Sequence, residues 1–143
     1  MLEQLKADLI RDEGVRLKPY RDTVGKLTIG VGRNLDDVGI SQTEATAMLD
    51  ADISEVIKEL DIAMPWWRGM PEPAQLALAN QRFQLGLPRL KGFANMLAAL
   101  EQGRFDEAAN HARQSKWAEQ VPGRAERIAK LYEEASTIQT KAL

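Results

Sequence analysis

Apolar side chains near the amino terminus are spaced three or four residues apart, from Leu2 through Leu5 to Leu9. This is the spacing of one face of an α-helix. The pattern stops at Gly14, a residue type that often follows a helix end. We therefore predict an amphipathic helix over residues 2–13.

Residues 15–35 differ in composition from the first segment and contain short stretches rich in Val, Ile, Thr and Tyr. These segments are separated by Gly25, Gly30 and Gly32, which suit tight turns between strands. The stretch predicts a small antiparallel sheet, and it is the only strand region that we predict.

A longer amphipathic helix follows the sheet. Ser41 and Glu44 have the spacing of a capping box, in which each side chain binds the backbone N–H of the other residue. One apolar stripe then runs along the helix: Ala45, Met48, Leu49, Ile53, Val56, Ile57 and Leu60. We predict a helix over residues 42–60, about 28 Å long and able to join two lobes. Because the rest of the chain has helical patterns, the predicted fold class is α+β, with the sheet confined to the first lobe.

Composition narrows the possible chemistry. The chain has 143 residues, enough for one compact domain or two small lobes, and 44% of them are hydrophobic. There is no cysteine and a single histidine, His111, so the sequence favours neither a zinc site nor a histidine-based triad. We expect no metal and no cofactor, and carboxylates as the reactive groups. No apolar run is long enough for a signal peptide or a membrane span, so we predict neither.

Two carboxylates are placed for acid–base chemistry. Glu13 closes the first predicted helix, and Asp22 lies in a turn before the glycine-rich strands. Carboxylates at a helix end and in a sheet loop can face each other across a groove. One could protonate a leaving oxygen while the other activates water. The alternative is that both are solvated surface charges, as most Asp and Glu residues are.

The residues around these two acids form a recognisable sequence signature. Residues 12–32 read DEGVRLKPYRDTVGKLTIGVG, which closely resembles the signature of the phage lysozymes of glycoside hydrolase family 24. Glu13, Asp22 and Thr28 fall on the Glu, Asp and Thr of that family. Later segments resemble the family in the same order: NQRFQLG at 80–86, GFANML at 92–97, GRFDEAANHARQSKW at 103–117 and QVPGRAERI at 120–128. The resemblance covers nearly the whole chain.

The resemblance implies one lysozyme domain over residues 1–143 with a mostly helical, two-lobed fold. The sheet lobe would cover about residues 13–60 together with the first helix, and the helical lobe about residues 61–143. Glu13 would be the general acid that protonates the glycosidic oxygen. Asp22, aided by the Thr28 hydroxyl, would hold or activate a water on the opposite face of the sugar. This arrangement inverts the anomeric carbon and requires the carboxyls to lie about 6.5–9.5 Å apart.

The resemblance also implies residues that bind the substrate. Arg124 falls on the arginine that pairs with the catalytic glutamate in this family; the alternative is a surface arginine beside a helix start. Other residues occupy places where the family contacts sugars, or lie on the same cleft helix: Asn34, Phe83, Met96, His111, Asn80 and Gln84. Asn34, Met96 and His111 depart from a leucine, a serine and an asparagine of the T-even phage enzyme. For Phe83 a core role is an equal alternative, and His111 could be a partly exposed helix residue.

Further departures from the family bear on stability. Arg33 stands where the T-even enzyme has a histidine, and Asp52 matches that histidine's aspartate partner. We predict an ion pair between Arg33 and Asp52 that fixes the sheet to the long helix. Gln81 and Arg82 are polar on a helix that relatives bury, so Arg82 needs a carboxylate partner or an exit to solvent.

The leading hypothesis is an enzyme that hydrolyses the β-1,4 bond between N-acetylmuramic acid and N-acetylglucosamine in bacterial peptidoglycan. A catalytically weak or silent peptidoglycan-binding module of the same fold is the second hypothesis. A helical nucleic-acid binder is the third; the net charge of −2 does not favour it. We expect a monomer that does not bind nucleic acid or membranes. By the resemblance, it would accumulate in the host cytoplasm and reach the wall through a holin.

Overall fold

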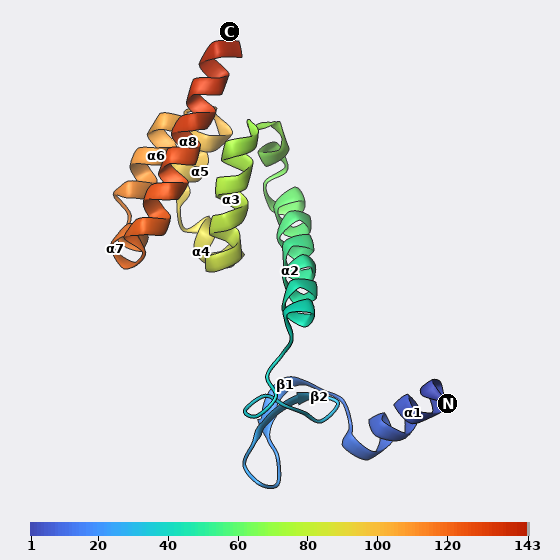
Figure 1. Cartoon of the computed structure of the whole chain (residues 1–143). Helices are drawn as coiled ribbons and strands as arrows, with labels where there is room; N and C mark the ends of the chain where they lie inside the picture. Colours follow the sequence, from blue (N-terminus) through green and yellow to red (C-terminus); the bar gives the residue numbers. More distant parts are fainter. Residues whose placement is uncertain (143) are drawn as a thin grey trace. The chain divides into compact units, whose positions relative to one another are not determined.

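The computed structural model describes residues 1–142, which form two compact units (Figure 1). The first unit runs from Met1 to Leu49, and the second begins at Asp50, within a long helix. The described residues fold into a small antiparallel sheet and a larger set of helices. The α+β class predicted from the sequence is therefore confirmed.

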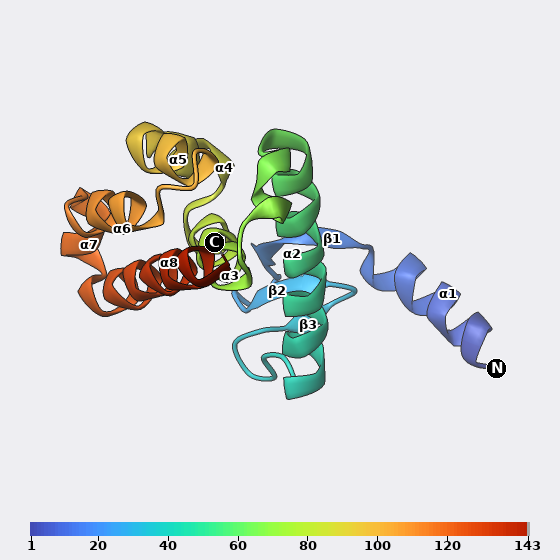
Figure 2. The same cartoon turned by 90° about the horizontal axis from the view of Figure 1, so that it is seen from above.

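The first unit begins with helix α1 (Leu2–Glu13), which has the bounds predicted from the apolar spacing. It ends at Gly14, whose φ of 74° lies in the left-handed region that favours glycine. None of its side chains is buried. Both views show α1 extending away from the sheet of this unit (Figures 1 and 2), so the sheet leaves the apolar stripe of α1 uncovered.

The sheet has three antiparallel strands in the order β1 (Arg16–Arg21), β2 (Leu27–Gly30) and β3 (Arg33–Asn34). The predicted sheet is confirmed. Thr28 lies on the central strand β2 and pairs with Asn34 on β3. The register therefore brings one predicted catalytic residue beside one predicted sugar-binding residue.

Helix α2 (Gln42–Ala63) confirms the predicted long helix and extends it to Ala63. Its start is the predicted capping box. The Glu44 N–H donates to Ser41 Oγ at 3.1 Å, and the Ser41 N–H donates to Glu44 Oε1 at 2.9 Å. These bonds satisfy backbone donors that a helix start leaves free.

Arg33 binds a different carboxylate from the one predicted. Its Nη1 and Nη2 atoms donate to the two carboxylate oxygens of Glu44 at 2.8 and 2.7 Å. Nη1 also donates to the Gly39 carbonyl at 3.1 Å. The prediction that Arg33 pairs with Asp52 was wrong. At the usual rise per residue, Asp52 lies about 12 Å further along the axis of α2 than Glu44. Arg33 thus ties β3 to the first turn of the helix.

This ion pair predicts an acid-dependent stability. The Arg33 hydrogen bonds and the Ser41 N–H lower the pKa of Glu44 from 4.5 to about 2. A carboxylate whose pKa is lowered by folding stabilises the native state above its unfolded pKa and loses that effect as the pH falls. We expect Arg33→Met to lower the melting temperature at neutral pH and to flatten its fall between about pH 4.5 and pH 2. Thermal melts across this range test the prediction.

Arg16 provides the matched control, because its guanidinium lies 4.4 Å from the centre of the Tyr20 ring. Arg16→Met removes the same charge from the same sheet and leaves the Glu44 site intact. We expect Arg16→Met to keep the acid dependence of the parent protein. An acid dependence that survives in Arg33→Met would contradict the assignment.

The second unit contains the end of α2 and seven further elements. These are η1 (Pro65–Gly69), α3 (Glu72–Leu85), α4 (Leu87–Lys91), α5 (Ala94–Glu101), α6 (Phe105–Arg113), α7 (Lys116–Gln120) and α8 (Pro122–Ala142). Helix α8 packs along α3 and α6 (Figures 1 and 2). Trp117 is buried in the core of this unit. Among the described helices, none is long and apolar enough to cross a membrane.

The polar residues of α3 find partners inside this unit. Gln81 is fully buried, and its Oε1 accepts a hydrogen bond of 2.5 Å from the Tyr132 hydroxyl on α8. Its Nε2 lies 3.5 Å from the sulfur of Met96. Arg82 pairs with Glu59 at 2.6 Å, which supplies the carboxylate partner that the sequence demanded. Gln81 is thus bonded at both ends of its amide, whereas Arg82 is paired through Nη2 and its buried Nε has no hydrogen-bond partner among the described residues.

The Gln81–Tyr132 contact predicts a loss of stability on Tyr132→Phe. Removing the hydroxyl leaves Gln81 Oε1 buried without that donor, which typically costs about 1–3 kcal/mol. Urea unfolding measures the loss. The double variant Gln81→Met, Tyr132→Phe removes both partners, and we expect it to recover most of the stability. Additive losses in the double variant would contradict a coupling between the two side chains.

Candidate active site

The first unit carries all three predicted catalytic residues. Glu13 is the last residue of α1, Asp22 directly follows β1, and Thr28 lies on β2. The helix end and the turn that the sequence predicted for the two acids are confirmed as local structures.

The Asp22 carboxylate is held by the turn that joins β1 to β2. Its Oδ1 accepts the backbone N–H groups of Val24 at 3.0 Å and Lys26 at 2.8 Å. The Gly25 N–H donates to the Asp22 carbonyl at 3.0 Å and closes the turn. Within residues 1–142, Oδ2 of Asp22 makes no protein hydrogen bond under 3.5 Å. One oxygen is therefore fixed, and the other can accept a hydrogen bond from water.

Thr28 is anchored to the same turn. Its side chain is buried, with 3% of the residue exposed, and its hydroxyl donates to the Lys26 carbonyl at 2.9 Å. Because that proton is committed, the lone pairs of the hydroxyl oxygen remain as acceptors. The Lys26 backbone thus binds Asp22 through its N–H and Thr28 through its carbonyl. Sequence reasoning missed this link, since every residue type except proline supplies the same backbone groups.

The Glu13 side chain lies against the turn between β2 and β3. A Cβ atom on Gly32 would be 2.7 Å from Glu13 Oε2. Gly32 also has a φ of 66°, in the region that favours glycine. The absence of a side chain at Gly32 therefore leaves room for the Glu13 carboxylate, a close approach that the sequence alone did not reveal.

The close contact between the Glu13 carboxylate and Gly32 predicts that Gly32→Ala lowers activity. The added methyl would push the flexible end of Glu13 aside, and a displacement of about 1 Å can cost up to about 100-fold in rate. The positive φ adds a strain of about 1–2 kcal/mol. Gly39→Ala is the matched control: its φ is 65°, but the nearest atom to the added methyl is the Leu35 carbonyl oxygen at 4.0 Å.

Steady-state rates on purified peptidoglycan, the substrate expected from the sequence, and thermal melts separate the two effects. We expect both alanine variants to lose similar stability and only Gly32→Ala to lose about 10- to 100-fold in kcat/KM. Equal activities of the two variants would show that Gly32 does not help to place Glu13.

The side chain of Asn34 forms hydrogen bonds with the loop that follows β3. Its Nδ2 donates to Asp37 Oδ2 at 3.0 Å, and its Oδ1 accepts the Asp37 N–H at 2.9 Å. Both ends of the amide are engaged, so a sugar contact of Asn34 would share these atoms. This reciprocal contact with Asp37 was not predicted from the sequence.

Three predicted binding residues lie on α3 in the second unit. Asn80 Oδ1 accepts a hydrogen bond of 2.9 Å from Nε of Arg124 on α8. Gln84 Oε1 accepts one of 2.9 Å from the indole N–H of Trp117. Phe83 is 44% exposed, so the alternative that it is a core residue is wrong. The structure thus joins Asn80 with Arg124, and the predicted approach of Arg124 to Glu13 stays a prediction.

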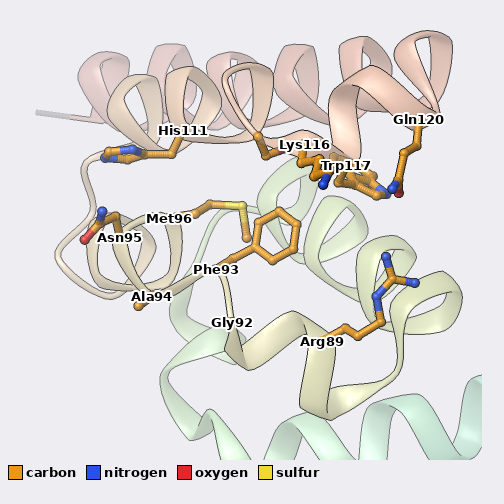
Figure 3. A pocket seen from close by; sticks show the side chains of 11 residues that line it. Arg89, Gly92, Phe93, Ala94, Asn95, Met96, His111, Lys116, Trp117 and Gln120 are labelled. Carbon is orange, nitrogen blue, oxygen red and sulfur yellow. The ribbon is translucent and has the colours of Figure 1, made fainter.

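The remaining two predicted binding residues line a pocket of about 480 Å³ in the second unit (Figure 3). Met96 is 1% exposed and comes from α5, while the half-buried His111 comes from α6. The rings of Phe93 and Trp117 meet edge to face in the same pocket, with their centres 6.0 Å apart. An aromatic pocket with a polar rim is typical of a ligand site.

The described residues bring no three His, Asp or Glu side chains close enough to hold a metal ion. The first unit instead has the Asp22 carboxylate held by backbone N–H groups, the exposed Glu13 carboxylate and the buried Thr28 hydroxyl. These groups suit proton transfer to a leaving oxygen and the positioning of a water.

Comparison with known proteins places the chain in a family. Residues 11–132 match the family described as Phage lysozyme. The chain is 32% identical to the pre-baseplate central spike protein of Enterobacteria phage T4, over 84% of the chain and 26% of that protein. It is 28% identical to a Dictyostelium discoideum protein named "Probable T4-type lysozyme 2", over 93% of the chain and 95% of that protein. It is 31% identical to the SAR-endolysin of Bacteriophage PS119, over 74% of the chain and 64% of that protein. The chain thus spans about a quarter of the spike protein and nearly all of the Dictyostelium protein.

Proposed function

The chain belongs to the phage lysozyme family of glycoside hydrolases, and we propose that it is a muramidase that degrades bacterial peptidoglycan. The bond cut is the β-1,4 link between N-acetylmuramic acid and N-acetylglucosamine. The family match supports the lysozyme activity, and the relative named as an endolysin supports the cell wall as its target.

The arrangement around Asp22 is the observation that carries the mechanism. In this proposal a water bound to Oδ2 of Asp22 also donates to the Thr28 oxygen. The Lys26 backbone supports this arrangement, because it forms hydrogen bonds with both side chains. Asp22 is then the base that takes a proton from this water as the water attacks the anomeric carbon. A carboxylate already tethered through its other oxygen needs little reorganisation for this step.

Glu13 is the general acid in this proposal. Its exposed carboxyl, resting against Gly32, donates a proton to the glycosidic oxygen while the bond to the anomeric carbon breaks. The water adds from the opposite face, so the product has the inverted configuration. After the reaction Asp22 holds the proton taken from water, and exchange with solvent resets both acids.

The two units would be the lobes of one lysozyme domain, with residues of both binding the glycan. In the second unit, Asn80, Phe83, Gln84 and Arg124 would contact sugars from α3 and α8. Met96 and His111 would contact the substrate from the pocket, and Asn34 would contribute from the first unit. The fixed amides of Asn80 and Gln84 support this role, because each keeps its NH₂ group as a donor.

Incubation with purified peptidoglycan tests the function against its alternative, a silent binding module of the same fold. We expect soluble muropeptides with new N-acetylmuramic acid reducing ends and clearing of permeabilised cells. Binding to the wall without new reducing ends would favour the silent module. New N-acetylglucosamine reducing ends would contradict the proposed bond.

We further propose that the protein acts as a monomer from the host cytoplasm and reaches the wall through a holin. Expression in bacteria with and without a co-expressed holin tests this route. We expect lysis only with the holin, and lysis without it would contradict the proposal.

A further inference from the structure

An ion pair joins the turn after β3 to the turn that holds Asp22. Nζ of Lys26 donates to Oδ1 of Asp37 at 3.2 Å. The backbone N–H of Lys26 binds the Asp22 carboxylate at 2.8 Å, and its carbonyl accepts the Thr28 hydroxyl at 2.9 Å. Through its side chain and its backbone, Lys26 therefore connects Asp37 with the two groups that hold the water in the proposed mechanism.

Both carboxylate oxygens of Asp37 are engaged. Oδ1 accepts the Lys26 ammonium, and Oδ2 accepts Nδ2 of Asn34 at 3.0 Å. The Asp37 N–H donates back to Asn34 Oδ1 at 2.9 Å, and the Val38 N–H donates to the Asn34 carbonyl at 3.1 Å. Asp37 is thus held by its own turn as well as by Lys26, so the ion pair is not the only contact that places its carboxylate.

The turn that carries Asp37 is anchored within the first unit. Arg33, which precedes this turn on β3, donates to the Gly39 carbonyl at 3.1 Å. The same guanidinium binds both carboxylate oxygens of Glu44 in the first turn of α2. The Lys26–Asp37 pair therefore ties the turn of Asp22 to a braced segment between β3 and α2 and not to a free loop.

We infer that Lys26 and Asp37 are positioning residues that act on the reaction through Asp22. The inference rests on the proposed function and names the side chains that hold its water-activating group in place. The N–H groups of Val24 and Lys26 fix the Asp22 carboxylate to its own turn. The ion pair with Asp37 then fixes Lys26, the residue that makes the shorter of these two bonds. It thereby favours the arrangement in which, by the proposal, Asp22 and Thr28 hold one water.

Removal of the ammonium is expected to lower kcat modestly. The side chains of Lys26 and Asp37 are 43% and 55% exposed, and an exposed ion pair stabilises one arrangement only weakly. Such a contact shifts the population of the reactive arrangement by no more than its own free energy. We therefore expect Lys26→Met to lower kcat about two- to fivefold and Lys26→Arg to restore most of the loss. The sheet is expected to persist in both variants, because Asp36 Oδ2 still accepts the Leu27 N–H at 2.8 Å.

Lys18→Met is the matched control for Lys26→Met. Lys18 is an exposed lysine on β1, and among the described residues it has no carboxylate within 4 Å. Both variants remove the same charge from the same sheet, so a change in KM caused by weaker attraction to the wall is shared by both. We expect only Lys26→Met to lower kcat. A double-mutant cycle with Asp37→Ala tests the pairing: each single variant is expected to lose about two- to fivefold, and the double variant no more than either.

Amide hydrogen exchange measured by NMR tests the inference independently of cleavage. Asp37→Ala changes no sequence neighbour of Val24 or Lys26, so the intrinsic exchange rates of these two amides stay those of the parent protein. We expect both N–H groups, which hold the Asp22 carboxylate, to exchange about two- to fivefold faster in this variant. The Leu35 N–H, which donates to a β2 carbonyl at 2.7 Å, is the internal reference and is expected to keep its rate.

A parent-like kcat in Lys26→Met would overturn the inference, and so would an equal loss of kcat in Lys18→Met. Unchanged exchange at Val24 and Lys26 in Asp37→Ala would also overturn it. If exchange at these amides rises but the parent protein releases no reducing ends, the proposed function fails and the attachment of the Asp22 turn by Asp37 stands. Release of reducing ends with unchanged kcat and exchange in the variants leaves the proposed function and removes the positioning role.

Discussion

Glu13→Gln is expected to lower kcat on peptidoglycan by about 100- to 10,000-fold, the usual contribution of a general acid. Glutamine has nearly the same shape as glutamate but has no acidic proton to give to the leaving oxygen. Because Glu13 is exposed at the end of α1, we expect the melting temperature to change by no more than about 2 °C. Turbidity clearing and reducing-end release measure the rate.

Glu3→Gln is the control for Glu13→Gln. Glu3 is an exposed glutamate on the same helix and lies 3.6 Å from Lys6. The substitution removes the same charge at the other end of α1, and we expect the parent rate. A Glu13→Gln protein that retained the full rate would remove Glu13 from the mechanism.

Asp22→Asn is expected to cause a loss of similar size, about 100- to 10,000-fold in kcat. The asparagine carbonyl can still accept the N–H groups of Val24 and Lys26, so the turn is expected to persist. The NH₂ group would replace the oxygen that is free to hold water, and an amide cannot take the proton. The pH–rate profile and thermal melts check that the loss concerns chemistry and not folding.

Asp36→Asn is the matched control in the same unit. Asp36 Oδ2 accepts the Leu27 N–H at 2.8 Å, so it too is a carboxylate held by a backbone donor of β2. We expect Asp36→Asn to keep at least about half of the parent rate, because the asparagine carbonyl can still accept the Leu27 N–H and Asp36 has no part in the proposed proton transfers. Equal losses in both variants would show that Asp22 acts through the fold of the sheet and not through water.

Local patterns in the sequence were enough to predict the elements that carry the candidate site. Apolar spacing and Gly14 set the end of α1 at Glu13, and the Ser41–Glu44 capping box set the start of α2. Such signals act within a few residues, so a single sequence contains them. The glycines within residues 15–35 likewise predicted the turn that follows β1.

Contacts set by the path of the chain could not be predicted in the same way. Arg33 pairs with Glu44 because the loop after β3 leads directly into the first turn of α2. The resemblance to the family had instead predicted Asp52 as the partner. The Lys26 link between Asp22 and Thr28 uses only backbone atoms, so no residue type marks it.

The anomeric configuration of the first product is the sharpest test of the roles proposed for Glu13 and Asp22. In the proposed mechanism Glu13 and Asp22 act from opposite faces of the sugar with a water between them, so each bond is cut by a single displacement. Proton NMR of a soluble peptidoglycan fragment during the first minutes of hydrolysis reports the configuration before mutarotation. The α-anomer is the predicted product, and an initial β-anomer would contradict the role given to Asp22.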